Sequence, residues 1–209
     1  MKEETARVLR LGEMIFRQRG SLTRRLIQAV VSVALRLFFR RIETSGAERV
    51  EADAPLVFVL NHPNGLIDPA LAFCALPRRV SFLAKSTLFR VPVAGWLMRV
   101  VEALPVYRRV DEGEDLKRNA ETFRACRELL RRGGCIALFP EGVSHDSTRL
   151  LPLKTGAARI ALGAVSLRDE RDEGSQELPL KIVPVGLYYT SKTSFRSEAL
   201  IRFGEPFEV

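Results

Sequence analysis

Hydrophobic and polar positions change along the chain in a pattern that predicts strands and helices in alternation. Short apolar runs bounded by turn residues indicate six buried strands. These are residues 55–60, 80–84, 103–107, 135–139, 181–187 and 199–203. Apolar residues at helical spacing indicate helices at 69–76, 92–101, 114–132 and 155–168. This alternation predicts an α/β fold with a largely parallel central sheet flanked by helices.

The first 44 residues have a different pattern, in which apolar positions are set among arginines. They predict two amphipathic helices, at 3–19 and 22–41, separated by Gly20-Ser21. Residues 26–35 carry no charge, but this uncharged run is too short for a bilayer, which needs about 20 residues. No small-residue cleavage site of a signal peptide follows it. We therefore expect an N-terminal amphipathic two-helix arm, residues 1–44, and a separate body, residues 45–209.

Most of the net charge lies in this arm. The formal net charge is +8, and residues 1–42 hold ten Lys or Arg and three Glu, so 10 − 3 = +7 of it falls there. Arginines beside an apolar helix face are typical of a helix that lies in the interface of an anionic membrane. The alternative is a helix that packs on the body and carries a solvated basic rim. Nucleic acid is not an expected partner, because no base-stacking aromatic residues are interleaved with the basic charge.

Composition indicates an ordinary globular protein, with 46% of residues hydrophobic and 28% charged. Cys74, Cys126 and Cys135 lie in apolar or helical stretches, so we expect buried thiols in a reducing compartment. The chain has two histidines and no metal-ligand spacing among its cysteines, so no metal site is expected. The charged segment 169–178 is expected to be an exposed loop.

A histidine and an aspartate follow the first apolar run of the body. His62 comes directly after this run, Pro63 and Asn64-Gly65 predict a turn, and Asp68-Pro69 predicts a helix cap and first helical position. The turn can bring the Asp68 carboxylate back towards the His62 imidazole, as a general base oriented by an acid requires. The alternatives are that Asp68 only caps the helix and that His62 is structural.

Other polar residues follow the later predicted strands. Lys85, Arg108 and the pair Glu141-Gly142 each come at or just after the end of an apolar run. Ligands gather at the carboxyl ends of parallel strands, so these residues are expected to meet on one rim. Arginine and lysine beside a base suit the transfer of a group onto an anionic, phosphate-bearing acceptor. A Ser144–His62–Asp68 hydrolase triad is disfavoured, because no glycine follows two residues after Ser144.

Four blocks of residues resemble, in sequence and in order, those of the glycerolipid acyltransferase superfamily, which contains the glycerol-3-phosphate and 1-acylglycerol-3-phosphate O-acyltransferases. The blocks are Asn61-His62-x5-Asp68-Pro69, Ala103–Arg108, Phe139-Pro140-Glu141-Gly142 and Val183-Pro184-Val185. The His–Asp spacing is one residue longer than the superfamily's usual spacing. Together with residues 141–146 and 151–156, it resembles the branch with the fungal glycerol-3-phosphate/dihydroxyacetone-phosphate acyltransferases. Ser144 stands where many lysophosphatidate enzymes carry arginine.

The resemblance implies that the body, residues 45–209, is a catalytic domain that moves a fatty acyl group from a thioester to a hydroxyl of a glycerol phosphate acceptor. His62 would be the general base and Asp68 would orient it. Arg108, Glu141 and Gly142 would shape the pocket for the acceptor phosphate. The other implied substrate contacts are Lys85, Asn61, Ser144, His145 and Lys154.

The co-substrate implied by the resemblance is an acyl-CoA or acyl-carrier-protein thioester. Because a thioester is already activated, neither a cofactor nor a metal is expected. The arm would hold the enzyme on the cytoplasmic face of a membrane as a peripheral or monotopic protein. Acylation of another lysophospholipid or hydroxyl acceptor is an alternative, and so is a membrane-bound interaction module without catalysis.

Overall fold

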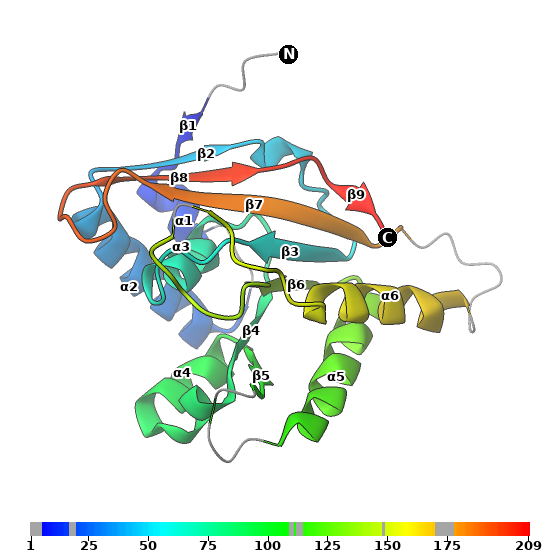
Figure 1. Cartoon of the computed structure of the whole chain (residues 1–209). Coiled ribbons are helices and arrows are strands. Elements are labelled where there is room, and N and C mark those ends of the chain that lie inside the picture. Colours follow the sequence, from blue (N-terminus) through cyan, green and yellow to red (C-terminus); the bar gives the residue numbers. More distant parts are fainter. Residues whose placement is uncertain (1–5, 17–19, 109–110, 112–114, 148, 170–177) are drawn as a thin grey trace.

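The computed structural model describes residues 6–16, 20–108, 111, 115–147, 149–169 and 178–209 (Figure 1). Within them a nine-stranded sheet forms the centre of the molecule, in the order β1-β2-β8-β7-β3-β6-β4-β5, with β9 paired to β7. The strands are β1 Arg7–Val8, β2 Arg41–Ser45, β3 Leu56–Leu60, β4 Ser81–Lys85, β5 Leu104–Val106, β6 Cys135–Leu138, β7 Lys181–Tyr189, β8 Glu198–Phe203 and β9 Phe207–Glu208.

The middle of this sheet is parallel. β3 pairs in parallel with β6 and β7, and β4 pairs in parallel with β6 and β5. β3 and β6 are nearly continuous apolar runs buried on both faces, which is typical of central parallel strands. The predicted α/β fold with a largely parallel sheet is confirmed, and all six predicted strands are present. β1, β8 and β9 add antiparallel pairs towards one side.

Helices cover both faces of the sheet. They are α1 Leu11–Phe16, α2 Leu22–Phe38, α3 Ile67–Ala75, α4 Pro92–Val100, α5 Asn119–Arg131 and α6 Gly156–Asp169, with short 3-10 turns at Ala47–Arg49, Ser86–Arg90 and Leu116–Arg118. Alternate residues of β3 separate the two layers: Leu56 and Phe58 pack with α2 and α3, whereas Val57 packs with α5 and α6. Figure 1 shows α5 and α6 together, away from α1–α3.

The predicted helix at 3–19 is wrong in its first half. Arg7–Val8 form β1, which pairs antiparallel with β2, and the helix begins only at Leu11. β2 was not predicted: α2 ends at Phe38 and Arg41–Ser45 enter the sheet in parallel with β8. Only Ile42 in this strand is a large apolar residue, so its alternation was too weak to distinguish from a helix end. The predicted division between residues 44 and 45 falls inside β2.

Parts of three predictions lie outside the described residues. These are residues 3–5 and 17–19 of the predicted first helix, residue 114 of the predicted helix 114–132, and residues 170–177 of the predicted loop.

The side of α2 that faces the body combines apolar residues such as Leu35 with buried polar residues. Arg24 is buried and donates hydrogen bonds to the carbonyl oxygens of Val80, at 3.0 Å, and Val101. Its guanidinium also lies 5.0 Å from the centroid of the Phe73 ring. One turn later Gln28 is buried and donates to the carbonyl oxygen of Met14 at 2.7 Å. Buried polar groups need partners of this kind, so these contacts seat α2 on α1, α3 and the sheet.

The outward side of α2 is apolar. Leu22, Leu26, Val30, Val33 and Leu37 recur at helical spacing and are between 42% and 81% exposed. α2 therefore packs on the body, as the second alternative expects, and it presents an apolar stripe to its surroundings. Among the helices that the structure describes, none has both the length and the apolar character needed to cross a bilayer.

Replacing Arg24 with Ala should lower the free energy of unfolding by several kcal/mol. Two buried carbonyl groups would lose their donors, and an unsatisfied buried group costs about 1–3 kcal/mol. Urea unfolding of this variant and of Arg25→Ala provides the measurement, because Arg25 is the exposed neighbour on the same helix. Equal losses in the two variants would contradict the anchoring role of Arg24.

Candidate active site

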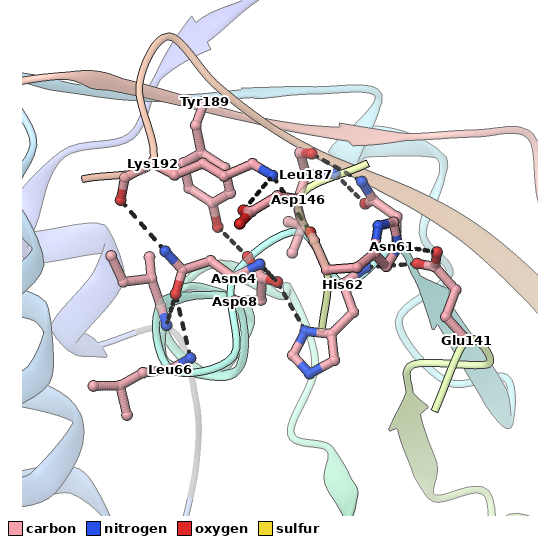
Figure 2. A network of polar contacts seen from close by, with 12 residues as sticks. Asn61, His62, Asn64, Leu66, Asp68, Glu141, Asp146, Leu187, Tyr189 and Lys192 are labelled. Carbon is pink, nitrogen blue, oxygen red and sulfur yellow. Dashed lines mark hydrogen bonds and ion pairs between the residues drawn. The ribbon is translucent and has the colours of Figure 1, made fainter. Parts of the chain in front are cut away.

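The turn between β3 and α3 brings His62 and Asp68 together. His62 Nδ1 lies 2.8 Å from Asp68 Oδ2, as the sequence predicted (Figure 2). The helix cap is not the predicted one. Asn64 Oδ1 accepts hydrogen bonds from the backbone N–H of Leu66 and Ile67, and Asp68 reaches back to accept the backbone N–H of Asn64 at 2.6 Å. Asn64 therefore supplies the side-chain acceptor just before α3, which begins at Ile67, and the Asp68 carboxylate is left to face the imidazole.

Asp68 is fully buried and surrounded by donors. Besides His62 and the Asn64 N–H, its Oδ1 accepts a hydrogen bond from the Tyr189 hydroxyl at 2.6 Å. A buried carboxylate is an acceptor, so the proton of the His62 pair lies on Nδ1. The lone pair of His62 is then on Nε2, which Figure 2 shows pointing away from the network. A neutral imidazole held in this way can take a proton at Nε2.

Two further contacts restrain His62. Its ring stacks on the ring of Phe139, with centroids 4.1 Å apart and an interplanar angle of 19°. Its backbone N–H donates to Glu141 Oε1 at 2.8 Å, and its carbonyl oxygen accepts the backbone N–H of His145 at 3.2 Å. Both sides of the His62 peptide are thus bound to the loop that follows β6.

Glu141 organises this loop. Its other oxygen accepts the backbone N–H of Leu151 at 2.8 Å and a hydrogen bond from His145 Nε2. His145 Nδ1 accepts the backbone N–H of Ser147, which assigns the ring proton to Nε2. Burial by itself would raise the pKa of Glu141, but the donors Leu151, His145 and His62 outweigh it and hold this pKa below its ordinary value.

A cavity of about 1080 Å³ opens beside His62. It is lined mainly by apolar side chains from α2, α3, α4, α5 and the strand ends, including Val31, Phe73, Phe82, Met98 and Phe123. This volume lies at the upper end of the range for small-molecule sites. The lining suits a long apolar group, and the polar residues are gathered at the strand ends.

Cations meet at Gly142, on the polar side of this cavity. Arg108 Nη1 donates to the Gly142 carbonyl oxygen at 2.8 Å. A Cβ on Gly142 would collide with the Lys154 ammonium, and the φ of +73° also favours glycine here. Arg108 and Lys85 both pair with Asp111, whose pKa is held below its ordinary value first by the hydrogen bonds from Arg108. Two cations facing one cavity beside a base form a candidate anion site.

The ten predicted site residues divide into two groups. Those that line the cavity are His62, Lys85, Arg108, Gly142, Ser144 and Lys154. The other four, Asn61, Asp68, Glu141 and His145, are absent from its lining. Asp68 and Glu141 contact His62, and His145 contacts Glu141. The Asn61 amide instead exchanges two hydrogen bonds with the backbone of Leu187 on β7, at 2.6 and 3.0 Å.

Sequence reasoning missed three residues of the site. Asn64 was interpreted only as a turn residue, although asparagine is also one of the residues preferred for capping a helix N-terminus. Asp111 and Tyr189 were not considered at all. Nothing in the local sequence marks them, because their partners come from other parts of the chain.

A family model described as Acyltransferase matches residues 41–188, which is more than half of the chain. This chain belongs to the acyltransferase family. The match confirms the superfamily predicted from the four blocks, and it starts at the first residue of β2.

Two curated relatives of this acyltransferase-family chain illustrate the similarity. It is 42% identical over 91 residues to glycerol-3-phosphate O-acyltransferase 2 of Saccharomyces cerevisiae, covering 44% of this chain and 11% of the yeast protein. It is 31% identical over 124 residues to a chloroplastic 1-acyl-sn-glycerol-3-phosphate acyltransferase of Brassica napus, covering 59% of this chain and 34% of that protein. The chain therefore spans only about a tenth to a third of their lengths.

A solved structure shares the fold. The 1-acyl-sn-glycerophosphate acyltransferase PlsC of Thermotoga maritima superimposes with a TM-score of 0.60 over 95% of this chain and 76% of its own, at 17% sequence identity. The likeness confirms the architecture of the sheet and helices in this acyltransferase-family chain.

Replacing Glu141 with Gln should lower the free energy of unfolding at pH 7 by about 1–3 kcal/mol, because one N–H donor would then face an amide N–H. This difference should shrink below pH 4.5, the ordinary pKa of a glutamate. Because the pKa of Glu141 in the folded protein lies below its ordinary value, the ionised carboxylate stabilises the fold above pH 4.5. This stabilisation is lost as the pH falls through the pKa in the folded state. Urea unfolding of both proteins between pH 7 and pH 3 measures it. A constant difference over this range would contradict the assignment.

Proposed function

We propose that this chain transfers a fatty acyl group from an acyl-CoA or acyl-carrier-protein thioester to a hydroxyl of a glycerol phosphate acceptor. The observation that carries the proposal is the His62–Asp68 pair at the edge of an apolar cavity, with Arg108 and Lys154 beside Gly142. The family match and the printed names of the relatives support the same reaction class.

In the proposed reaction, His62 Nε2 takes the proton from the acceptor hydroxyl as its oxygen attacks the thioester carbonyl. The new C–O bond forms, the C–S bond breaks, and the imidazolium returns the proton to the departing thiolate. Asp68 stabilises the imidazolium through Nδ1 while the charge is present. A thioester is sufficiently activated for this transfer, so we propose that it proceeds without a metal or cofactor.

The two parts of the cavity correspond to the two substrates. The apolar part between α2, α3, α4 and α5 would take the fatty chain of the donor. Arg108 and Lys154 would bind the acceptor phosphate, since a guanidinium and an ammonium beside a glycine can approach its oxygens closely. Arg108 already donates to Asp111 and Gly142, so its remaining N–H groups are those available to the phosphate.

Replacing His62 with Ala should reduce acyl transfer by about 10²–10⁴-fold, the usual contribution of a general base. Asp68→Asn should also lose most activity. The measurement is thioester consumption with glycerol 3-phosphate, dihydroxyacetone phosphate and lysophosphatidate offered in parallel. The comparison variant is Ser144→Ala, which removes the hydroxyl that a serine hydrolase would use as its nucleophile and should retain acyl transfer.

Full loss with Ser144→Ala and retention with His62→Ala would reverse the proposed roles. Turnover in the His62→Ala variant above about a tenth of the wild-type rate would exclude general-base catalysis by His62. If none of the three acceptors supports thioester consumption, a glycerol phosphate is not the acceptor, and another hydroxyl compound takes its place.

We further propose that the outward stripe of α2 rests in the interface of an anionic membrane on its cytoplasmic face. Leu22, Leu26, Val30, Val33 and Leu37 form a stripe that no described element covers, and Arg25 lies exposed on the same helix. An apolar helix face among basic residues has the character of an interfacial helix. Ile27 and Val31, on the neighbouring side of α2, line the cavity, so a fatty chain could pass between membrane and site beside this helix.

Replacing Leu26 and Val30 with Ser should lower binding to anionic vesicles at least about tenfold. Burying one such side chain stabilises by about 1.5–3 kcal/mol, and about 1.4 kcal/mol is tenfold in affinity. The change leaves the charge unaltered, so the loss should persist at high salt, where attraction between Arg and lipid is screened. Vesicle co-sedimentation measures it, with the exposed Leu162 of α6 replaced by Ser as the control. Unchanged binding of the double variant would exclude the stripe as the docking surface.

A further inference from the structure

Tyr189 stands at the last position of β7, and its hydroxyl lies 2.6 Å from Asp68 Oδ1, on the carboxylate that holds His62 (Figure 2). We propose that Tyr189 is a positioning residue of the His62–Asp68 pair, which sets both the orientation of the carboxylate and the basicity of the imidazole. The inference rests on the proposed function only in so far as this pair is taken to perform general-base catalysis.

The position of the Tyr189 ring is well defined. It stacks on Phe39, with centroids 5.8 Å apart and an interplanar angle of 22°, and Phe39 is itself fully buried at the end of α2. A ring held in this way keeps its hydroxyl directed at one oxygen of Asp68. The pKa of Tyr189 is raised, first by burial and then by the neighbouring Asp68 charge, so the phenol keeps its proton and remains a donor.

The two oxygens of the Asp68 carboxylate accept hydrogen bonds from different donors. Oδ1 accepts from Tyr189, whereas Oδ2 accepts from His62 Nδ1 and from the Asn64 N–H. With Oδ1 held, the carboxylate cannot rotate away from the imidazole. The same hydrogen bond draws negative charge away from Oδ2 and so limits how strongly Asp68 stabilises the imidazolium. Loss of the hydroxyl should therefore loosen the carboxylate and raise the pKa of His62.

Tyr188 supplies a matched control. It is the preceding residue of the same strand, and its side chain is 55% exposed because successive residues of a strand point to opposite faces. Tyr188→Phe and Tyr189→Phe each remove one hydroxyl from neighbouring positions of β7. The second keeps the ring that stacks on Phe39, so the fold around Asp68 retains its packing.

The decisive measurement is the pKa of His62 by NMR titration of its ring signals. The chain has two histidines, so His62→Ala assigns the pair of signals. The other charged or titratable groups near the His62–Asp68 pair are Glu141, His145, Asp146 and Lys192, with Lys85, Arg108 and Lys154 also lining the cavity. All of them are unchanged in both tyrosine variants. A difference between the variants is therefore due to the Tyr189 hydroxyl.

We expect Tyr189→Phe to raise the pKa of His62 by about 0.5–1. Loss of one hydrogen bond to the Asp68 carboxylate strengthens its interaction with the imidazolium more than its interaction with the neutral imidazole. Tyr188→Phe should leave the pKa of His62 at the wild-type value. In acyl transfer, kcat of Tyr189→Phe should fall by about 3–30-fold with KM little changed, and the acidic limb of the pH–rate profile should move to higher pH.

The titration needs no turnover, so the two proposals can fail separately. If the wild-type protein transfers no acyl group but Tyr189→Phe raises the pKa of His62, the proposed function fails and the coupling of Tyr189 to the pair stands. If the pKa of His62 is the same in Tyr189→Phe and Tyr188→Phe, Tyr189 is only a packing residue. If it falls in Tyr189→Phe, the hydroxyl does not limit the basicity of the imidazole. Either result overturns the inference.

Discussion

A carboxylate removed from water must be surrounded by hydrogen-bond donors, and Asp68 imposes this requirement on the centre of the molecule. Its donors come from the β3–α3 turn, through His62 and the Asn64 backbone, and from the end of β7, through Tyr189. The turn can satisfy Asp68 only in the conformation that directs His62 Nδ1 inward. Burial of one acid thus selects the tautomer and orientation of the imidazole and leaves Nε2 facing the cavity.

Glu141 imposes the same requirement on the loop after β6. Because β3 and β6 are adjacent parallel strands, their carboxyl ends bring Glu141 next to the backbone of His62. Together the two buried acids hold His62 by its side chain and by its main chain. Such doubly held groups need little reorganisation when a reaction develops charge, which is the general advantage of a preorganised site. Both acids therefore serve the site without lining its cavity.

The orientation of α2 is set by buried hydrogen bonds on one side and leaves apolar residues exposed on the other. Its buried face includes Arg24 and Gln28, which donate to carbonyl groups at the end of α4, before β4 and in α1. Five of its apolar residues, Leu22, Leu26, Val30, Val33 and Leu37, remain exposed on the opposite side, where water does not favour them. The exposed apolar stripe of α2 is the surface on which the proposed membrane interface rests. Phe39, at the end of the same helix, stacks on Tyr189 and brings the arm into contact with the site.

The sequence by itself determined the alternation of strands and helices, the six strands of the body and the closeness of His62 and Asp68. These follow from short-range patterns: the periodicity of apolar residues, and a turn that reverses the chain within a few positions. It also led to the correct family, through four blocks that keep their order. Tertiary structure alone decided that Arg41–Ser45 enter the sheet, that Arg24 and Gln28 of α2 face inward, and that Asn61, Glu141 and His145 turn away from the cavity. Periodicity tells which side chains share a face, but not which element covers that face. Tyr189 and Asp68 are 121 positions apart, and only the parallel pairing of β3 with β7 brings the hydroxyl to the carboxylate.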